Sequence, residues 1–273
     1  MSATRFNLYI KVFLVTISFA AIFYLFIKHL APTDSSISNW MINYQGNFTR
    51  RGLIGEIVFK LGIFLDLHIR FLIFIIQSLF YIIFYYLIYK FYKNFNLDFI
   101  FVLALFSPLF LIYPLAELES LGRLEIILLV VFLSYSLSVK KNCKVYFLYF
   151  YVIIPLLILI WEPSIFYLSF FVLIYIFNLE KINLSKIIKK IFVIIFPAIT
   201  TLFIIFFFKQ SSEENKIMCE ALLEFYNQKC YMGLKAPPQS MKVGILEVHH
   251  LFGKEGTLTG TINFLRFILV FIV

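Results

Sequence analysis

Residues 71–89 read FLIFIIQSLFYIIFYYLIY, a stretch without a charged side chain that is long enough to cross a lipid bilayer as one helix. The chain around it has 273 residues, of which 62% are hydrophobic and only 14% are charged. Soluble domains carry about a quarter charged residues, so this chain has too few to cover a water-exposed surface. The composition predicts an all-α, polytopic transmembrane helical bundle whose main partner is the lipid bilayer.

Similar apolar runs on both sides of this stretch predict about seven complete spans. They cover approximately residues 8–27, 71–89, 99–115, 121–139, 145–160, 164–178 and 191–208. No small-residue cleavage pattern follows the first run, which favours an uncleaved helix over a signal peptide. Residues 263–273 form an eighth run too short to cross, which we interpret as the start of a further transmembrane helix, truncated here. The domains expected are therefore a bundle over 1–208, an extracytoplasmic loop subdomain over 209–262, and this helix start.

Lysines indicate how the helices are oriented. With the N-terminus in the cytoplasm, every lysine-rich loop faces the cytoplasm, as the positive-inside rule requires. These lysines are Lys90, Lys93, Lys140, Lys141, Lys144, Lys181, Lys186, Lys189 and Lys190. Because the net charge of +9 comes from such short loops, it does not indicate nucleic acid.

The same rule decides the role of residues 53–70, LIGEIVFKLGIFLDLHIR. If this segment crossed the membrane, every later loop would change sides and the lysines would face outward. Glu56, Lys60 and Asp66 also make it a costly span. We therefore expect an interfacial helix in the first outer loop, with Glu56 and Lys60 paired one turn apart.

The expected outer loop after residue 208 contains two of the three cysteines. Cys219 and Cys230 lie in an extracytoplasmic segment, where disulfides form, so we expect a bridge, with two free thiols as the alternative. An amphipathic stretch around Cys219 predicts a short helix that caps the bundle through Ile217, Ala221, Leu222 and Phe225. His249 and His250 lack zinc-ligand spacing, so we expect neither a metal nor a cofactor.

Charged side chains from separate segments are expected in one layer at the outer face. They are Arg50, Arg51, Glu56, Glu117, Glu119, Arg123, Glu125 and Glu162. Arg123 and Glu125 lie about a turn inside the expected fourth span, where a charge usually faces a partner or a wet cavity. Glu119 and Arg123 also have the spacing of an intrahelical pair. The alternative is that Arg50 and Arg51 only anchor the interface and that Glu162 is a turn residue in headgroup water.

These residue types fit a site for a phosphorylated lipid. A guanidinium binds phosphate through two parallel hydrogen bonds, so Arg50 and Arg51 are candidates to hold a pyrophosphate, with Arg123 assisting. A nearby carboxylate can act as general base on an acceptor hydroxyl. The candidates for that catalytic role are Glu162, Glu117, Glu119 and Glu125.

Three short motifs carry a resemblance to known proteins. GNFTRRGL at 46–53, GRLE at 122–125 and WEP at 161–163 resemble a group of bacterial multi-pass envelope proteins similar to GT-C glycosyltransferases and to O-antigen or exopolysaccharide polymerases. The resemblance covers roughly residues 1–210. It implies a lipid-linked sugar donor, a bacterial inner-membrane location and a catalytic site in outer loops. GT-C enzymes usually carry an acid in the first outer loop, where this chain has Asp34, whereas polymerases use outer-loop arginines.

The sequence thus predicts an enzyme of cell-envelope polysaccharide synthesis. It would transfer or polymerise sugars from a polyprenyl-phosphate-linked sugar on the extracytoplasmic side. Two alternatives remain: a transporter or flippase for a lipid-linked or anionic substrate, and a non-catalytic membrane assembly protein. A transporter needs charge near the bilayer midplane, and the middle of each expected span has almost none.

Overall fold

The computed structural model describes residues 3–31, 35–93, 111–139, 145–178, 184–207 and 211–230. These residues form helices, turns and loops, without a strand. The long helices are α1 (Ala3–Leu30), α4 (Ile69–Tyr92), α8 (Glu125–Val139) and α12 (Leu184–Phe207). The described part of the chain is therefore all-helical, as the composition predicted.

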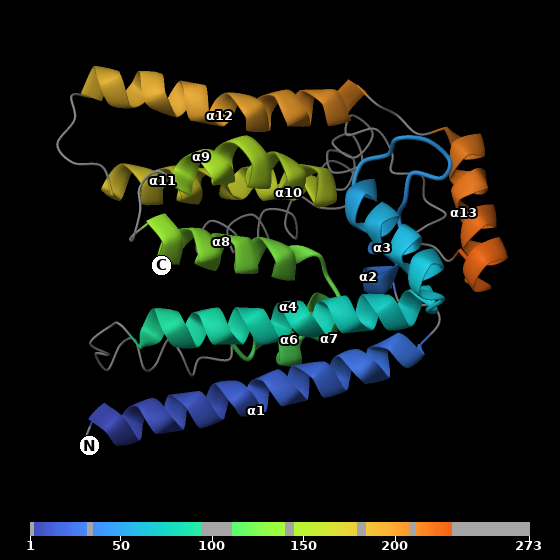
Figure 1. Ribbon diagram of the computed structural model, residues 1–273, viewed down its shortest axis with the longest axis horizontal. Helices are drawn as coiled ribbons and strands as arrows, with labels where there is room; N and C mark the ends of the chain where they lie inside the picture. Colours follow the sequence, from blue (N-terminus) through green and yellow to red (C-terminus); the bar gives the residue numbers. More distant parts are fainter. Residues whose placement is uncertain are drawn as a thin grey trace, which may run out of the picture.

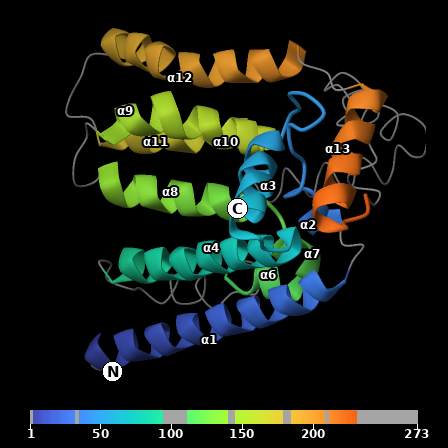
Figure 2. The same cartoon turned by 45° about the vertical axis from the view of Figure 1, so that its right-hand side comes forward.

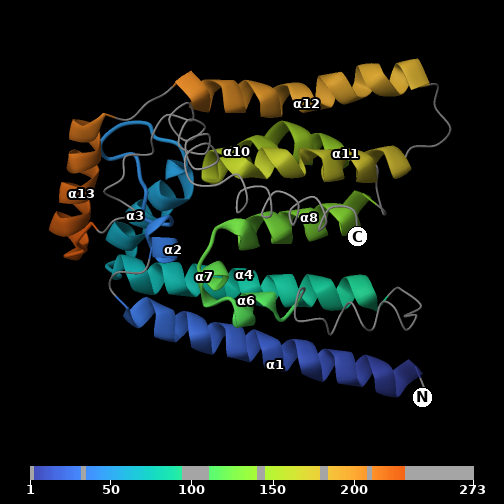
Figure 3. The same cartoon turned by 180° about the vertical axis from the view of Figure 1, so that it is seen from behind.

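The long helices lie side by side in one stack. Figures 1, 2 and 3 show the order α1, α4, α8, then α9 (Tyr146–Leu148), α10 (Ile154–Ile160) and α11 (Leu168–Phe177), and finally α12. A π-helical turn, η2 (Tyr149–Ile153), joins α9 to α10, and a 3-10 helix, η3 (Glu162–Tyr167), leads into α11. Helices α1 and α4 run in opposite directions, whereas α4 and α8 both begin at the end of the stack near α13 (Figure 1). Sequence-distant loops therefore meet at that end.

One apolar stripe of α1 packs on α4. Ile10, Leu14, Ile17, Ala21 and Leu25 recur at intervals of three and four residues, so they share one helix face, and all are buried. The opposite face remains exposed although it is equally apolar, with Phe19 at 70% of its full accessible area. Apolar residues therefore surround α1, while tertiary packing covers only one side of it.

The expected count of about seven complete spans is not what the described residues show. Two described helices, Leu8–Leu30 and Ile69–Tyr92, have the length and apolar composition needed to cross a membrane. Four apolar helices are shorter: Glu125–Val139, Tyr146–Ile160, Glu162–Phe177 and Lys190–Ile205. The turns at 122–124 explain part of the difference, because they lie inside the expected span 121–139 and delay the start of its helix to Glu125. Residues 99–110 of the expected third span, Asp34, the two histidines at 249–250 and the expected eighth span lie outside the described residues.

The segment predicted as one interfacial helix over 53–70 contains a helix and a turn. Helix α3 covers Gly52–Leu65, with Lys60 Nζ 3.0 Å from Glu56 Oε1 as expected. It ends at Asp66, whose φ of 51° lies in the left-handed region. The prediction was therefore wrong at its end, because Ile69 and Arg70 begin α4. Arg70 is buried there and donates through Nε to the His29 carbonyl at the end of α1 (3.1 Å).

Helix α13 (Ser212–Tyr226) crosses the ends of the long helices (Figure 1). Ser211 begins it with a capping box, in which the Ser211 hydroxyl accepts from Glu214 N–H and the Glu214 carboxylate accepts from Ser211 N–H. Its buried residues are Asn215, Met218, Leu222 and Tyr226. Ile217 and Phe225 are exposed, so the predicted face was partly wrong. The apolar residues of α13 form two neighbouring stripes along the helix. The stripe that contains Met218, Leu222 and Tyr226 packs on α3, and the stripe that contains Ile217 and Phe225 stays exposed.

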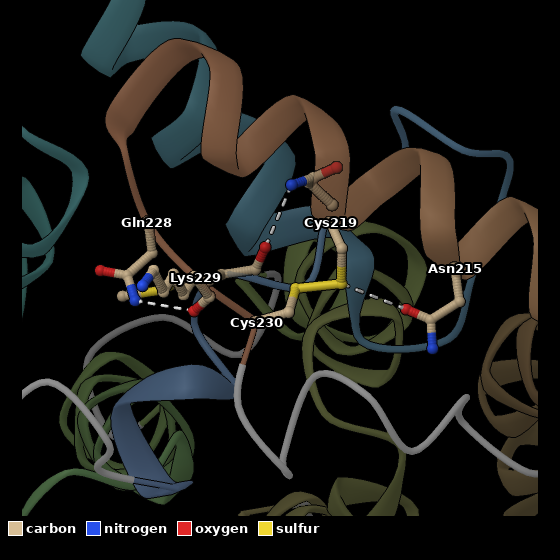
Figure 4. Close-up of a disulfide and its surroundings, with 7 residues drawn as sticks. Asn215, Cys219, Gln228, Lys229 and Cys230 are labelled. Atoms are coloured by element: carbon tan, nitrogen blue, oxygen red, sulfur yellow. Dashed lines mark hydrogen bonds between the residues drawn. A yellow bond between two sulfur atoms is a disulfide. The ribbon is translucent and has the colours of Figure 1, made fainter.

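The disulfide expected from the cysteine positions is formed. Figure 4 shows Cys219, on α13, joined to Cys230 after the helix ends, with Asn215 and Gln228 on either side. The bridge closes a short segment across the turn at Asn227, which has a left-handed φ of 50°. It therefore holds the chain that leaves α13 against the helix.

Candidate functional site

The loop before α3 places two arginines at one end of the stack. Its first residues, Trp40, Met41 and Ile42, are buried. Asn43 then folds the backbone into a tight turn, because its side-chain oxygen accepts from Gln45 N–H (3.0 Å) and its amide donates to the Met41 carbonyl (3.1 Å). These contacts aim the rest of the loop back over α3.

A carboxylate on α3 holds the middle of this loop. Glu56 accepts hydrogen bonds from Tyr44 N–H (2.9 Å) and from the Gln45 side-chain amide (3.1 Å). Burial alone would raise the pKa of Glu56, but these bonds and Lys60 outweigh it, so the pKa lies below its ordinary value. Burial and the Glu56 charge together raise the pKa of Tyr44 to about 12, so its hydroxyl stays neutral. Glu56 is therefore a structural carboxylate.

Arg51 occupies a strained backbone position directly before α3. Its φ of 64° and ψ of 4° lie in the left-handed region, which costs a residue with a side chain roughly 1 kcal/mol or more. Gly52 N–H closes the turn by donating to the Thr49 carbonyl (3.3 Å). Arg51 is one of three described non-glycine residues with positive φ, and the other two, Asp66 and Asn227, end helices. The turn thus directs the side chains of Arg50 and Arg51 toward the junction of α10 and η3.

Both arginines meet Glu162, which follows α10. Arg51 Nε lies 2.6 Å from Glu162 Oε2, and Arg50 Nη1 lies 3.4 Å from Glu162 Oε1. The Glu162 side chain is only 7% exposed, whereas the arginines keep about a quarter of their area open. Trp161 is extended, Glu162 begins η3 and Pro163 follows it in the first turn, so the backbone fixes the position of Glu162. We call Arg50, Arg51 and Glu162 the arginine cluster.

Several polar atoms in and around the arginine cluster lack a full set of partners. Arg50 Nε, Glu162 Oε1, Ser164 Oγ and Tyr44 Oη are buried without a hydrogen bond among the described residues. Burial lowers the pKa of Arg50, Arg51 lowers it further, and the Glu162 carboxylate opposes both effects. A buried guanidinium with unused donors is costly unless an acceptor reaches it. The cluster therefore has the properties of an anion-binding site.

A second charged pair lies at the start of α8. Arg123 Nη1 is 3.9 Å from Glu125 Oε1, and the two side chains are 49% and 31% exposed. They border a cavity of about 170 Å³ between α4, α8 and the short helix α6 (Tyr113–Ala116). We call this pair and its cavity the Arg123–Glu125 pocket.

The turn that carries Arg123 is held from two sides. The Gly122 carbonyl accepts from Trp40 Nε1–H (2.8 Å) and from the Gln77 side-chain amide (3.0 Å). A Cβ at Gly122 would collide with the Ser36 hydroxyl, so a larger residue here would have to displace that side chain. Since Trp40 belongs to the loop that leads to Arg50 and Arg51, one residue links the two charged regions.

Glu117 and Glu119 are not brought into this arrangement. Both are exposed, and neither pairs with an arginine within the part of the chain that the structure describes. The expected intrahelical pair of Glu119 with Arg123 is wrong, because helix α7 (Leu118–Leu121) ends before Arg123. Arg123 faces Glu125 instead.

Sequence reasoning missed the residues that position the site. Trp40 and Gln77 are completely buried and support the Gly122 turn, and Glu56 holds the arginine loop. Gln77 had a visible signal, since a polar side chain inside an apolar run such as 71–89 is costly without a partner. Trp40 had none, because its partner is a backbone carbonyl far along the chain.

No family model, no curated protein and no solved structure matches the chain.

Proposed function

We propose that this chain is a multi-pass membrane protein that binds a polyprenyl-phosphate-linked sugar at the end of the stack carrying the arginine cluster. It transfers or polymerises that sugar on the extracytoplasmic side of a bacterial plasma membrane. The observation that carries the proposal is the convergence of Arg50 and Arg51 on Glu162 beside the Arg123–Glu125 pocket.

The arginine cluster supports phosphate binding because Glu162 uses few of the available donors. It engages Nη1 of Arg50 and Nε of Arg51, and each guanidinium has five N–H donors. Glu162 therefore holds both side chains in place while other N–H groups can face a phosphate. A diphosphate fits two adjacent planar guanidinium groups better than it fits two flexible ammonium groups.

The carboxylates divide into two roles in this proposal. Both oxygens of Glu162 face guanidinium groups, so Glu162 is a positioning residue for the arginines. Glu125 is more exposed and borders the pocket, so it is the best-placed candidate for the general base. Glu117 and Glu119, exposed and unpaired with arginine in the described chain, take no catalytic role in the proposal.

The apolar exterior of the stack supports membrane insertion. Large side chains such as Phe19 on α1 and Phe203 on α12 (62% exposed) cover outward-facing surfaces that a soluble monomer rarely leaves open. The described lysines of the expected cytoplasmic loops also lie on one end of the stack. Lys90 and Lys93 end α4, and Lys186, Lys189 and Lys190 begin α12, opposite to α13 (Figure 1).

The phosphate site is tested by lipid binding to the purified protein in nanodiscs. We expect a long-chain polyprenyl diphosphate to bind and the uncharged polyprenol of the same length to bind at least tenfold more weakly. Arg51→Lys keeps the charge but removes the planar fork, so it should lose most of this difference. Lys93→Ala, which removes an exposed cation at the far end of α4, is the matched control and should bind like the unmodified protein. Equal binding of both lipids contradicts the proposal and favours a role in assembly.

The orientation is tested with the protein's own cysteines. Cys143 lies in an expected cytoplasmic loop, whereas Cys219 and Cys230 are bridged at the opposite end. A membrane-impermeant maleimide added to intact spheroplasts should leave Cys143 unlabelled until the membrane is permeabilised. Labelling of Cys143 in intact spheroplasts contradicts the proposed orientation, and recovery of the protein in the soluble fraction contradicts membrane insertion itself.

A further inference from the structure

We infer that the Arg123–Glu125 pocket binds one neutral sugar ring, an inference that rests on the proposed function and assigns its second subsite. The pocket combines a charged rim with an apolar floor. Arg123, Glu125 and Ser120 supply polar groups, and Tyr81, Phe84 and Tyr113 supply aromatic surface. Ligand pockets of this kind use a few polar groups to orient a ligand that apolar walls enclose.

The charges on the rim select against ions. Arg123 and Glu125 lie 3.9 Å apart and carry opposite charge, so the rim is close to neutral. The attraction and the repulsion that the pair exerts on any ion largely cancel, so the rim gives neither an anion nor a cation a net charge to bind. Among the described residues, no group of three or more His, Cys, Asp or Glu side chains could hold a metal ion. The rim instead matches a neutral ligand that both donates and accepts hydrogen bonds.

Vicinal hydroxyls have this property. One hydroxyl can donate to the Glu125 carboxylate while its neighbour accepts from the Arg123 guanidinium, since the carboxylate only accepts and the guanidinium only donates. Both bonds are charge-assisted and therefore stronger than bonds between neutral groups. Because both side chains are only partly buried, a ligand in the pocket can contact them without a rearrangement of the protein.

The aromatic side chains suit the other surface of a sugar ring, where C–H groups point outward. Tyr113 is half exposed beside the pocket, whereas Tyr81 and Phe84 are buried and rigid in α4. The Tyr81 hydroxyl donates to the Leu121 carbonyl (3.0 Å), so this ring is fixed in position. A volume of about 170 Å³ is below the roughly 300 Å³ or more of pockets for drug-sized ligands, which favours a single ring over an oligosaccharide.

The position of the pocket relates this ring to the lipid phosphate. Trp40, in the loop that leads to Arg50 and Arg51, donates to the carbonyl of Gly122, the residue before Arg123 (2.8 Å). A phosphate at the arginine cluster and a sugar in the pocket would therefore be held by connected parts of the fold. Where the ring is the acceptor, Glu125 takes the proton of its hydroxyl as that oxygen bonds to the anomeric carbon of the donor sugar. The bond from that carbon to the lipid diphosphate breaks, and the diphosphate leaves while the arginine cluster holds it. The ring is therefore either the acceptor or the sugar on the donor, and both present the same vicinal hydroxyls.

Ligand-observed NMR on the purified chain in nanodiscs tests the inference with a panel of methyl pyranosides. We expect at least one glycoside to bind, and Glu125→Ala to weaken it roughly tenfold or more by removing a charge-assisted bond. Leu129→Trp places bulk at the wall of the pocket without changing a charge and should also abolish binding. Lys93→Ala is the control. Circular dichroism and formation of the disulfide report whether each variant is folded.

The outcomes separate this inference from the proposed function. Arg51→Lys should lose diphosphate binding and keep glycoside binding, because Arg51 is not part of the pocket lining. If no glycoside binds, or if folded Glu125→Ala and Leu129→Trp bind it as well as the unmodified protein, the sugar subsite is refuted. In that case Arg51-dependent diphosphate binding leaves the phosphate site standing. If attaching a polyprenyl phosphate raises the affinity for the glycoside, the pocket binds the donor sugar. If the affinity does not change, the pocket binds the acceptor.

Discussion

The arginine cluster and the Arg123–Glu125 pocket both join arginine to glutamate, but they are built differently. Arg51 and Glu162 are 111 residues apart in sequence and meet at 2.6 Å around a nearly buried carboxylate. Arg123 and Glu125 are almost adjacent in sequence, yet they lie 3.9 Å apart and stay partly exposed. Sequence proximity therefore does not measure how tightly two charges pair. The distant pair organises the fold, whereas the near pair stays available to a ligand.

The largest expected effect that tests this contrast is the loss of the carboxylate in the arginine cluster. Glu162→Ala leaves two partly buried guanidinium groups without their anion, which should lower the stability by about 3 kcal/mol. Glu125→Ala, with both partners partly exposed, should cost less than about 1 kcal/mol. Thermal unfolding in detergent compares the two variants. Equal losses of stability in the two variants would show that Glu162 is no more important to the fold than Glu125.

The second effect comes from α13, which contacts the loop of the arginine cluster. Glu214 accepts a hydrogen bond from the Asn47 amide (2.6 Å), so α13 holds the loop that carries Arg50 and Arg51. Replacing Cys219 and Cys230 by serine removes the short crosslink and should cost about 2 kcal/mol. Diphosphate binding should weaken while glycoside binding persists. A parallel loss of both ligands would contradict a local role for α13.

A smaller effect is expected at the residue that links the regions. Trp40→Phe keeps most of the buried ring and removes the bond from Nε1 to the Gly122 carbonyl, although Gln77 still donates to that oxygen. The loss should be about 1 kcal/mol. Because Trp40 supports both the arginine loop and the Gly122 turn, both diphosphate and glycoside affinities should fall. A change confined to one ligand would show that the two regions are independent.

The smallest effect concerns pH. The folded-state pKa of Glu56 is lowered, so its stabilising contribution is present above the unfolded pKa near 4.5 and is lost as pH falls through the folded value. We expect the unfolding temperature to fall below about pH 4.5, and Glu56→Gln to reduce this dependence. As the pH falls, the loop at Tyr44 should lose its structure before the Arg123–Glu125 pocket does. An unchanged acid profile in the glutamine variant would exclude Glu56 as the cause.

Part of this arrangement was predictable from local sequence. The long apolar runs predicted helices, the spacing of Glu56 and Lys60 predicted their ion pair, and the compartment argument predicted the bridge between Cys219 and Cys230. Each of these depends on residues at most eleven positions apart. Backbone geometry over such short separations is restricted, so residue type and spacing carry most of the information.

The helix limits and helix faces were less predictable. The turn at 122–124 ends α7 and moves Arg123 toward Glu125, because Trp40 and Gln77 hold the Gly122 carbonyl from elsewhere in the chain. On α13 the sequence offers two apolar columns, and the Tyr226 hydroxyl donating to the Phe59 carbonyl shows which column faces α3. A periodic pattern marks apolar surface, but it does not say which neighbour covers it.

The sequence by itself determined that the chain is helical and highly apolar, and that charged residues gather in the segments between the helices. Only the tertiary structure decided that Arg50 and Arg51 share Glu162, while Glu117 and Glu119 remain outside the site. The physical reason is that helix formation is satisfied by hydrogen bonds a few residues apart. Which charges meet at the end of a stack depends instead on how all the helices pack together.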